Sequence, residues 1–281
     1  MNFREDDQRF LTTFLRERTG ISIPLGSESL LETRLSPLME RMGLPGPSAL
    51  VARLQDSRDE SLRTQVVERL TTHETRFFRD EGLFRALGTR LLAEAGEAHP
   101  GQPVRIWCAA ASTGQEPWSV AMVAREMGSA WGQPAVEILA TDLSGEAVAC
   151  GMEALYSQLE VNHGVSPERL EHHFLREGRH WRVRPELRAQ VRWARHNLTQ
   201  DPAPGEEFDF ILCRNVLIYF ENRTRTLVLQ NLSNRLRPTG ALLLGSGEAL
   251  GLPHTDLVRL EDGEGGSLYR RSNLASLPRA A

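Results

Sequence analysis

The sequence predicts an all-α domain followed by an α/β domain whose mainly parallel sheet carries a small antiparallel β insert. Three observations support this fold class. Apolar residues recur at helical spacing up to residue 70, short apolar runs alternate with helical segments from residue 104 onward, and the segment 156–197 changes to short alternating runs. At 281 residues the chain is long enough for one enzyme-sized α/β domain and a smaller second domain.

The first domain is predicted by the spacing of its apolar side chains. Leu31, Leu35 and Leu38 lie three or four residues apart, as on the buried face of an amphipathic helix. Glycines and prolines, as in the run at 45–47, interrupt this pattern where turns are expected. We therefore expect a bundle of about four helices over residues 1–75.

The α/β domain, expected over residues 76–281, is predicted by short apolar runs that alternate with helical patterns. Val104–Cys108 indicates a buried strand, and a glycine turn and a helical segment follow it. Strands joined by helices form a parallel sheet with right-handed crossovers. The expected strands cover 104–108, 136–140, 208–213, 241–244 and 267–270, the expected helices 82–94, 117–127 and 223–236, and a turn at 237–240 closes the last helix.

Within this domain, the segment at about 157–196 departs from the α/β pattern. Short alternating runs at 174–176, 180–183 and 191–194 predict strands around tight turns. We expect them to form an antiparallel β subdomain. The C-terminal segment 272–281 is predicted to be disordered.

Composition excludes several classes of protein. Its 40% apolar and 25% charged residues are ordinary for a globular protein, and no apolar run approaches the roughly 20 residues that span a bilayer. The N-terminal residues lack the apolar segment of a secretion signal, so we expect a cytoplasmic protein without membrane insertion. The 3 cysteines are widely spaced, which predicts buried free thiols rather than disulfides or a metal site.

Charge indicates the kind of partner. A net charge of −4 argues against an overall nucleic-acid-binding surface, which would be basic. All 33 basic residues are arginine, so every cationic side chain is a planar fork that suits carboxylate partners.

Polar residues follow three of the expected parallel strands. The loop Ala109–Glu116 follows the first strand, Asp142 the second and Arg214-Asn215 the third. In an open parallel sheet, ligands bind outside the carboxyl ends of the strands. Small residues in the first loop let a ligand approach the backbone, and a carboxylate after the second strand can accept both hydroxyls of a ribose.

Each of these residues also has a structural explanation when taken alone. A glutamate in a first helical turn, such as Glu116, is favoured by the helix dipole, and an aspartate after a strand, such as Asp142, often caps a helix. The first loop lacks both a G-x-G-x-x-G pattern and the lysine of a P-loop. The combination at three successive strand ends favours a nucleoside ligand.

Four segments resemble the CheR-type chemoreceptor glutamate methyltransferases. They are THETRFFRD at 72–80, RIWCAAASTGQEPWSVAM at 105–122, ILATDLSGEAV at 138–148 and FDFILCRNVLIYF at 208–220. The resemblance covers nearly the whole chain. It implies a Rossmann-like S-adenosylmethionine-dependent methyltransferase domain with the β insert, preceded by the all-α domain. It also implies S-adenosylmethionine as cofactor, S-adenosylhomocysteine as product and no metal.

The resemblance implies the residues that bind the cofactor. In this family the loop at 72–79 closes over S-adenosylmethionine, which makes Thr75 and Arg79 contacts. Glu116 corresponds to the residue that holds the methionyl amine, and Asp142 to the one that holds the ribose.

Further contacts follow from the same resemblance. Asn197 and Leu198 flank the adenine, and Arg214 and Asn215 complete the pocket. His73 is placed with them, although the family usually has asparagine at this position. An imidazole donates and accepts hydrogen bonds as an amide does, but it is larger and can ionise.

The implied reaction is an in-line displacement in which a glutamate carboxylate attacks the sulfonium methyl and becomes a γ-methyl ester. With a pKa of about 4.3 the glutamate is ionised at neutral pH and needs no general base. Arg79 can fork onto that carboxylate, and Tyr219 can donate its hydroxyl to steer one oxygen. The resemblance points to the same two catalytic residues. Taken alone, Arg79 could instead pair with Asp80 or Glu81.

The substrate implied is the cytoplasmic helical region of a methyl-accepting chemoreceptor, which is rich in carboxylates. Arg34 and Arg41 lie on one face of a predicted helix and are candidates for docking it, with pairing to Glu32 and Glu40 as the alternative. No nucleic acid partner is expected, and the protein is expected to be a monomer. Some members of the family capture a receptor's C-terminal peptide on the small sheet through a longer, glycine-containing loop. The short turn Arg176–Arg179 predicts no such capture.

Two other functions stay open. A methyltransferase could act on a nucleic acid or a small molecule, because the arginines between Arg176 and Arg195 form a basic stretch, although such stretches are usually solvated faces. No N-P-P-Y-like run, as found in enzymes that methylate nucleobase amines, follows the third strand. A non-catalytic module that senses cofactor occupancy is the other possibility. Arg79, Asp142 and Tyr219 argue against it, and His73 keeps it open.

Overall fold

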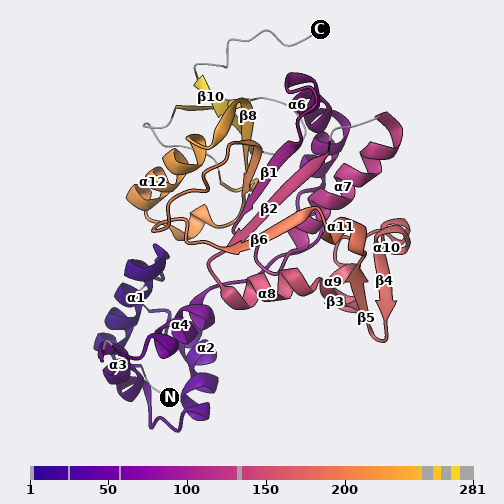
Figure 1. Ribbon diagram of the computed structural model, residues 1–281. Coiled ribbons are helices and arrows are strands. Elements are labelled where there is room, and N and C mark those ends of the chain that lie inside the picture. Colours follow the sequence, from indigo (N-terminus) through magenta and orange to yellow (C-terminus); the bar gives the residue numbers. More distant parts are fainter. Residues whose placement is uncertain are drawn as a thin grey trace. The chain divides into compact units, whose positions relative to one another are not determined.

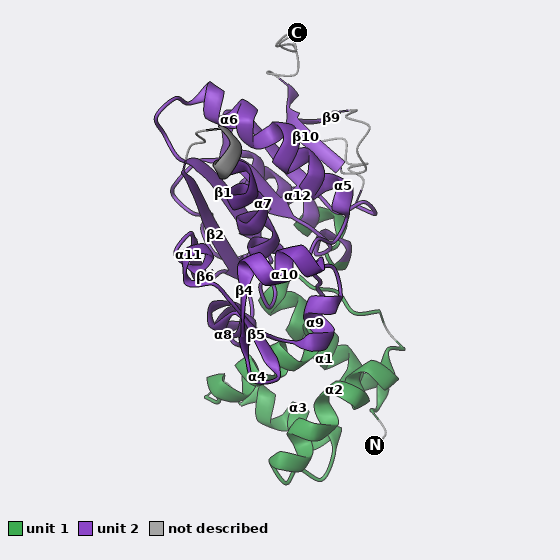
Figure 2. Cartoon of the chain, turned by 90° about the vertical axis from the view of Figure 1, so that its right-hand side faces the viewer, with its two compact units in different colours: residues 1–72, 219–224 green, residues 73–218, 225–281 purple. Residues whose placement is uncertain are grey.

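A computed structural model of the chain describes residues 3–24, 26–56, 58–131, 135–248, 256–260 and 267–272. The chain divides into two compact units (Figure 2). The first comprises residues 1–72 with 219–224, and the second residues 73–218 with 225–281. The tail predicted to be disordered lies, apart from Ser272, outside the described residues.

The first unit is helical. Its helix α1 stops at Gly20, whose φ of 75° is left-handed, and the Asp59 side chain accepts the Leu62 N–H at the start of α4. Apolar side chains such as Leu11 and Leu35 are fully buried in its core. The predicted all-α domain is confirmed. The helices are α1 (Glu5–Thr19), α2 (Glu28–Arg41), α3 (Pro47–Gln55) and α4 (Glu60–Leu70).

The second unit contains a mixed sheet with the strand order β6-β2-β1-β7-β8-β10-β9 (Figure 1). β6, β2, β1, β7 and β8 pair in parallel, and β10 pairs antiparallel with both β8 and β9. The strand order reverses at β1, with β2 on one side and β7 on the other, which places a ligand-binding switch point beyond its carboxyl end. The strands are β1 (Val104–Ala109), β2 (Val136–Asp142), β6 (Val191–Arg195), β7 (Phe208–Cys213), β8 (Leu236–Leu244), β9 (Leu257–Leu260) and β10 (Ser267–Arg271).

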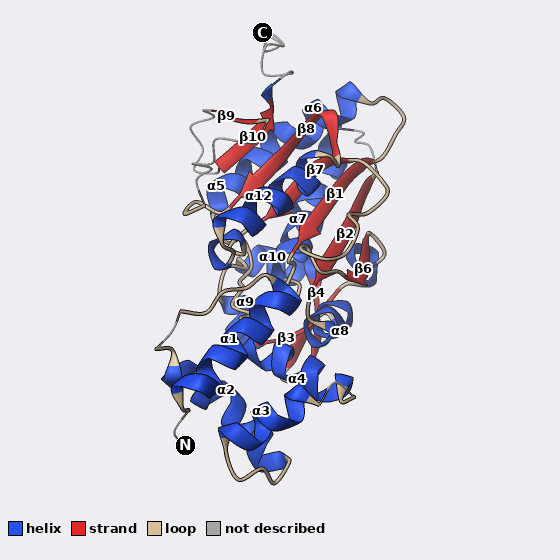
Figure 3. Ribbon diagram, turned by 90° about the vertical axis from the view of Figure 1, so that its left-hand side faces the viewer, coloured by secondary structure: helices blue, strands red, loops and turns tan. Residues whose placement is uncertain are grey.

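Helices connect the strands and cover both faces of the sheet. α7 (Gln115–Trp131) joins β1 to β2, α8 (Gly145–Glu153) follows β2, and α12 (Asn222–Ser233) leads into β8. Figures 1 and 3 show α6 and α7 on one side of the sheet and α12 on the other. The predicted α/β architecture is confirmed. The other helices are α5 (Glu81–Ala86), the π-helix η1 (Leu87–Leu91), α6 (Leu92–Ala98), α11 (Pro185–Arg188) and the 3-10 helix η2 (Leu217–Tyr219).

The central strands are buried on both faces. Every residue of β7 is buried, and Ile106, Trp107 and Cys108 of β1 are almost completely inaccessible. Strands covered on both sides need apolar residues at successive positions, so continuous apolar runs predicted these strands correctly.

The insert is an antiparallel sheet with the order β3-β5-β4. Helices α9 (Gln158–Asn162) and α10 (Pro167–His173) lie between its first two strands along the chain. Ser157 and Glu160 form a capping box at the start of α9. An antiparallel insert was predicted, but its two helices and its first strand were not. The strands are β3 (Leu155–Ser157), β4 (Phe174–Glu177) and β5 (His180–Val183).

The prediction that residues 191–194 belong to this antiparallel insert is wrong. They lie in β6, which pairs in parallel with β2 and forms one edge of the large sheet. Val191 is buried and Arg192 is exposed, because an edge strand presents polar residues to solvent. That alternation resembled the pattern of a solvated antiparallel ribbon.

Two other boundaries differ from the predictions. α12 ends at Ser233 and β8 begins at Leu236, so residues 237–240 lie in the strand and not in a turn. Gly240 is needed there, because a Cβ would lie 2.9 Å from the carbonyl oxygens of Phe208 and Asp209. The strand β9 was not predicted.

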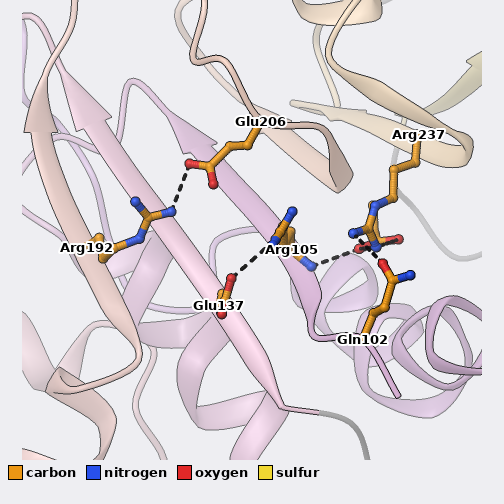
Figure 4. Close-up of polar contacts among 7 residues, drawn as sticks. Gln102, Arg105, Glu137, Arg192, Glu206 and Arg237 are labelled. Carbon is orange, nitrogen blue, oxygen red and sulfur yellow. Dashed lines mark hydrogen bonds and ion pairs between the residues drawn. The ribbon is translucent and has the colours of Figure 1, made fainter. Parts of the chain in front are cut away.

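The amino ends of the strands carry a row of paired charges (Figure 4). The buried Asp209 carboxylate of β7 also accepts the Arg105 backbone N–H of β1 at 2.8 Å, which ties the two strands together. These charges are neutralised within the unit, so their contacts account for them structurally. The pairs are Arg105–Glu137 (N···O 3.3 Å), Arg237–Asp209 (2.9 Å) and Arg192–Glu206 (2.8 Å).

Candidate active site

The carboxyl ends of four neighbouring parallel strands bring most of the predicted cofactor-binding residues to one edge of the sheet. Backbone hydrogen bonds continue across this edge beyond the strands. The Ala111 N–H donates to the Thr141 carbonyl at 2.8 Å, and the His196 N–H donates to the Asp142 carbonyl at 2.8 Å. The loops that follow β6, β2 and β1 are therefore adjacent. The loop after β7 lies next to the loop after β1, because β7 pairs in parallel with β1.

The loop after β1 has an unusual backbone. Ala110, Ser112 and Gly114 have φ values of 64°, 50° and 102°, all left-handed. At Gly114 a Cβ would lie 2.8 Å from the Tyr156 hydroxyl, which itself donates to the Thr113 carbonyl at 2.8 Å. Packing imposes this shape, and the small side chains leave the backbone open to a ligand.

Asp142 organises two of the loops. One carboxylate oxygen accepts the Ser112 N–H at 2.8 Å, and the other accepts the Ser144 N–H at 2.9 Å. The side chain is buried, which strengthens these charge-assisted bonds. Asp142 therefore ties the loop after β1 to the start of α8.

Arg214 is the centre of a buried ion-pair cluster. Its guanidinium donates to Glu116 at 2.7 Å, to the Asp80 carboxylate at 2.5 Å and to the Arg79 carbonyl at 2.6 Å. The Arg214 side chain is only 2% exposed, and its Nε has no hydrogen-bond partner among the described residues. The cluster ties the loop after β7 to the start of α7 and to the residues before α5.

The Glu116 carboxyl has a raised pKa in this cluster. Burial raises the pKa of its carboxyl, and the charge of Glu248 raises it too, so that together they outweigh the lowering by Arg214 and Arg79. A further cation placed beside Glu116 would favour its ionised form.

A buried carboxylate that the sequence did not single out holds the loop after β7. Glu248 accepts the N–H groups of Asn215 at 2.6 Å, Leu217 at 2.9 Å and Gly245 at 3.0 Å. These bonds fix Asn215, whose φ is 59°. Glu248 follows β8, the next parallel strand. A search for polar residues after the end of this strand, as was made for the other three, could have found it.

The loop that precedes α5 is fixed at several points. The His73 carbonyl accepts a hydrogen bond from the Ser112 hydroxyl at 3.0 Å, and the Phe78 N–H donates to the Ser119 hydroxyl at 3.0 Å. Thr75 and Arg79 are half-buried. Among the described residues the Arg79 guanidinium forms no hydrogen bond or ion pair, although its charge lowers the pKa of Glu116. The neighbouring Asp80 pairs with Arg214.

Three other predicted residues have simpler surroundings. The Asn197 amide oxygen accepts the Thr199 N–H at 3.0 Å, which shapes the turn after β6, and Leu198 is half-buried beside it. Tyr219 is half-buried and belongs to the first unit, where its carbonyl accepts the Ser22 N–H at 2.9 Å. Its catalytic role stays a prediction.

The cysteines are free, as predicted, but not all are buried. Cys108 and Cys213 are buried in the sheet, whereas Cys150 on α8 is exposed. Among the residues that the structure describes, no helix has the length and apolarity needed to cross a membrane.

Two family descriptions match the chain. Residues 73–264 match the family described as CheR methyltransferase, SAM binding domain, and residues 6–71 match CheR methyltransferase, all-alpha domain. The chain belongs to the CheR methyltransferase family. This confirms the predicted family and fold class, and it makes S-adenosylmethionine the cofactor of the second domain.

Curated proteins of the CheR family align with most of the chain. A chemotaxis protein methyltransferase 1 of Pseudomonas aeruginosa is 38% identical over 269 residues, which cover 94% of this chain and 98% of that protein. Chemotaxis protein methyltransferase Cher2 of Pseudomonas putida is 38% identical over 256 residues, covering 89% and 93%. A chemotaxis protein methyltransferase of Escherichia coli is 32% identical over 247 residues, covering 85% and 83%.

The residues at the sheet edge suit the cofactor of a CheR methyltransferase. Glu116 is a buried carboxylate whose pKa is raised by burial, and Asp142 is a buried carboxylate beside a loop of small residues.

Proposed function

We propose that this chain transfers a methyl group from S-adenosylmethionine to glutamate side chains of bacterial chemoreceptors and so forms γ-methyl esters. The family match and the naming of its relatives as chemotaxis protein methyltransferases support this. The observation that carries it is Arg79, a half-buried arginine. Its guanidinium forms no hydrogen bond or ion pair among the described residues, and Arg214 holds its backbone carbonyl. Such a group suits an incoming carboxylate.

The proposed cofactor contacts use the strand ends. Asp142 accepts the ribose hydroxyls, and Glu116 pairs with the methionyl amine. Arg214 and Asn215 complete the pocket after β7. The remaining contacts are Asn197 and Leu198 beside the adenine, and His73, Thr75 and Arg79 from the loop before α5.

The bound cofactor supplies an electrophilic methyl group on a sulfonium sulfur. Arg79 keeps the substrate carboxylate ionised as water is excluded, which preserves its nucleophilicity. Tyr219 donates its hydroxyl to one carboxylate oxygen and orients the other toward the methyl. No proton has to be removed, so positioning supplies the catalysis.

A nucleic acid substrate is less well supported. Several arginines of the basic stretch already have acidic partners: Arg182 forms two hydrogen bonds with Glu177, at 2.5 and 2.9 Å, and Arg192 pairs with Glu206 at 2.8 Å. These pairs reduce the positive charge available to phosphates.

The docking proposal now depends mainly on Arg41. Arg34 donates to the Leu70 and Thr71 carbonyls at 3.0 and 2.7 Å, so it satisfies the C-terminal end of α4. Arg41 is exposed and donates to Gln65 at 2.6 Å, a contact that a receptor carboxylate can replace.

Transfer of tritium from methyl-labelled S-adenosylmethionine to receptor-rich membranes tests the proposal. We expect the label to be released as methanol by mild base, as from an ester. Tyr219→Phe should slow the transfer and leave S-adenosylhomocysteine affinity unchanged, since its hydroxyl acts only on the carboxylate. Base-stable label, or label in nucleic acid, would exclude the ester-forming function.

A further inference from the structure

Arg79 lies between two residues with left-handed backbones. Phe78 has a φ of 50° and Asp80 a φ of 63°, a region that side chains other than glycine rarely adopt. A bulky residue keeps such a conformation only where its surroundings impose it. The contacts of Phe78 and Asp80 therefore fix the backbone on either side of Arg79.

Asp80 is held by Arg214, but Phe78 needs its own support. Its N–H donates to Ser119, and its ring packs edge-on against Phe84 with 5.4 Å between ring centroids. The guanidinium of Arg169, on α10 of the insert, lies 4.0 Å from the centroid of the Phe78 ring. At this distance a cation and an aromatic face attract each other.

Arg169 is itself fixed by a carboxylate on another element. Glu126 of α7 accepts two hydrogen bonds from it, both at 2.9 Å, and lies 3.0 Å from His173 Nε2. Burial raises the pKa of Glu126, but hydrogen bonds from His173 and Arg169 outweigh this effect and lower the pKa to about 2. The carboxylate therefore holds Arg169 throughout the physiological pH range.

The insert contacts the neighbouring residue of the same loop as well. Gly164, between α9 and α10, has a φ of 114°, and a Cβ there would lie 2.0 Å from the Phe77 carbonyl oxygen. The Phe77 ring packs edge-on against Tyr156 and Phe174, with centroid distances of 5.0 and 5.7 Å. The insert thus contacts two successive residues immediately before Arg79.

We propose that Arg169 is a positioning residue for methyl transfer: held by Glu126, it fixes Phe78 and thereby the backbone that presents Arg79. The small insert then forms part of the support of the active site, apart from any contact with a receptor. This inference rests on the proposed function of Arg79.

The test compares two arginine variants of the insert in the full-length protein. Arg169→Met should lower kcat about tenfold or more and leave S-adenosylhomocysteine affinity within about threefold, since Asp142 and Glu116 are untouched. Arg182→Met is the matched control, because it removes an equally forked pair with Glu177 that does not contact this loop. Arg169→Lys, which keeps the cation, should recover part of the lost rate.

Coupling to Arg79 separates positioning from a general structural role. In an Arg79→Ala background, Arg169→Met should change kcat by less than about twofold, because the two act through one group. Equal losses in both backgrounds, or an Arg169→Met enzyme as active as the Arg182→Met control, would overturn the inference.

Hydrogen exchange keeps the inference testable if the proposed function fails. The Phe78 amide should exchange faster in Arg169→Met than in Arg182→Met, whatever the substrate is. A wild-type enzyme that methylates no receptor would remove the proposed function, whereas equal Phe78 exchange in both variants would remove this inference alone.

Discussion

Asp142 has a structural role, and we propose that the same carboxylate also binds the ribose. Because both of its oxygens already accept backbone N–H groups, Asp142→Asn places an amide N–H₂ against the N–H of Ser112 or Ser144 and loses acceptors for the ribose. We expect S-adenosylhomocysteine affinity to fall at least about tenfold, since charged hydrogen bonds contribute about 1.5 to 3 kcal/mol each. Titration calorimetry measures this loss.

Asp209→Asn is the matched control for Asp142→Asn. It replaces a buried aspartate of the same sheet, but at the amino ends of the strands, where it pairs with Arg237. It should lower the free energy of unfolding and leave the affinity unchanged. An Asp142→Asn protein that binds within about threefold of the wild type would remove Asp142 from the ribose site.

Glu116 predicts a pH dependence. Its pKa is raised in the folded protein, so it keeps its proton at pH values where the unfolded chain has lost it. The contribution of Glu116 to the free energy of unfolding of the ligand-free protein should therefore fall as pH rises from the ordinary value near 4.5 through the raised one. In Glu116→Gln this contribution should disappear, so the difference between the wild-type and variant pH profiles measures it.

The same carboxyl links protonation to cofactor binding. An amine requires ionised Glu116, so S-adenosylhomocysteine affinity should weaken as pH falls through the raised pKa, and Glu116→Gln should show weak, nearly pH-independent binding. Calorimetry at several pH values measures both. A wild-type affinity without pH dependence in this range would separate Glu116 from the amine.

Single residues could be predicted from the sequence where a strand end fixed their place. Asp142 and Arg214 directly follow apolar runs, so their position at the sheet edge was readable. Glu248 was not, because its role arises from the approach of the segment after β8 to the loop after β7. The Arg169–Phe78 contact likewise joins positions far apart in the sequence.

At the scale of elements, the β4–β5 hairpin argues against capture of a receptor C-terminal peptide. The hairpin turns through Gly178, with a φ of 61°, and pairs Glu177 directly with His180. Arg182 binds Glu177 through two hydrogen bonds, so an ion pair links the two strands near the hairpin turn. The longer, glycine-containing loop that goes with peptide capture in the family is absent from this described hairpin.

We therefore expect no strand addition by a receptor C-terminal peptide. Calorimetry of the purified protein with the C-terminal peptides of its own organism's receptors should show no micromolar binding, because the hairpin lacks the long loop that accompanies peptide capture. Micromolar binding of any one peptide would show that the short turn does not have this consequence.

Elements were predictable where burial repeats along the chain. The runs at 104–108 and 208–213 gave β1 and β7, because strands covered on both faces stay apolar throughout. β6 was assigned to the antiparallel insert, because apolar and polar residues alternate in an edge strand as they do in an antiparallel ribbon. The short helices α9 and α10 have too few turns for a period to show.

At the scale of the whole molecule, the net charge of −4 does not attract an acidic receptor. Electrostatic docking must therefore depend on local clusters of arginine. Arg41→Glu should lower the methylation rate about tenfold at low salt and by less than about twofold at high salt, where screening already weakens the contact. Rates measured across a salt series test this. Arg58→Glu, an equal charge change on another exposed arginine of the first unit, is the control. Equal effects of the two variants would remove Arg41 from the docking surface.

Peptide mass spectrometry of a receptor cytoplasmic fragment, incubated with the protein and S-adenosylmethionine, tests the central claim most directly. We predict the added mass of one methylene on glutamate residues, lost on mild base treatment and nearly absent with Arg79→Ala. A base-stable methyl group on another residue type, or an unmodified receptor with a cofactor-binding protein, would contradict the assignment of a glutamate methyltransferase.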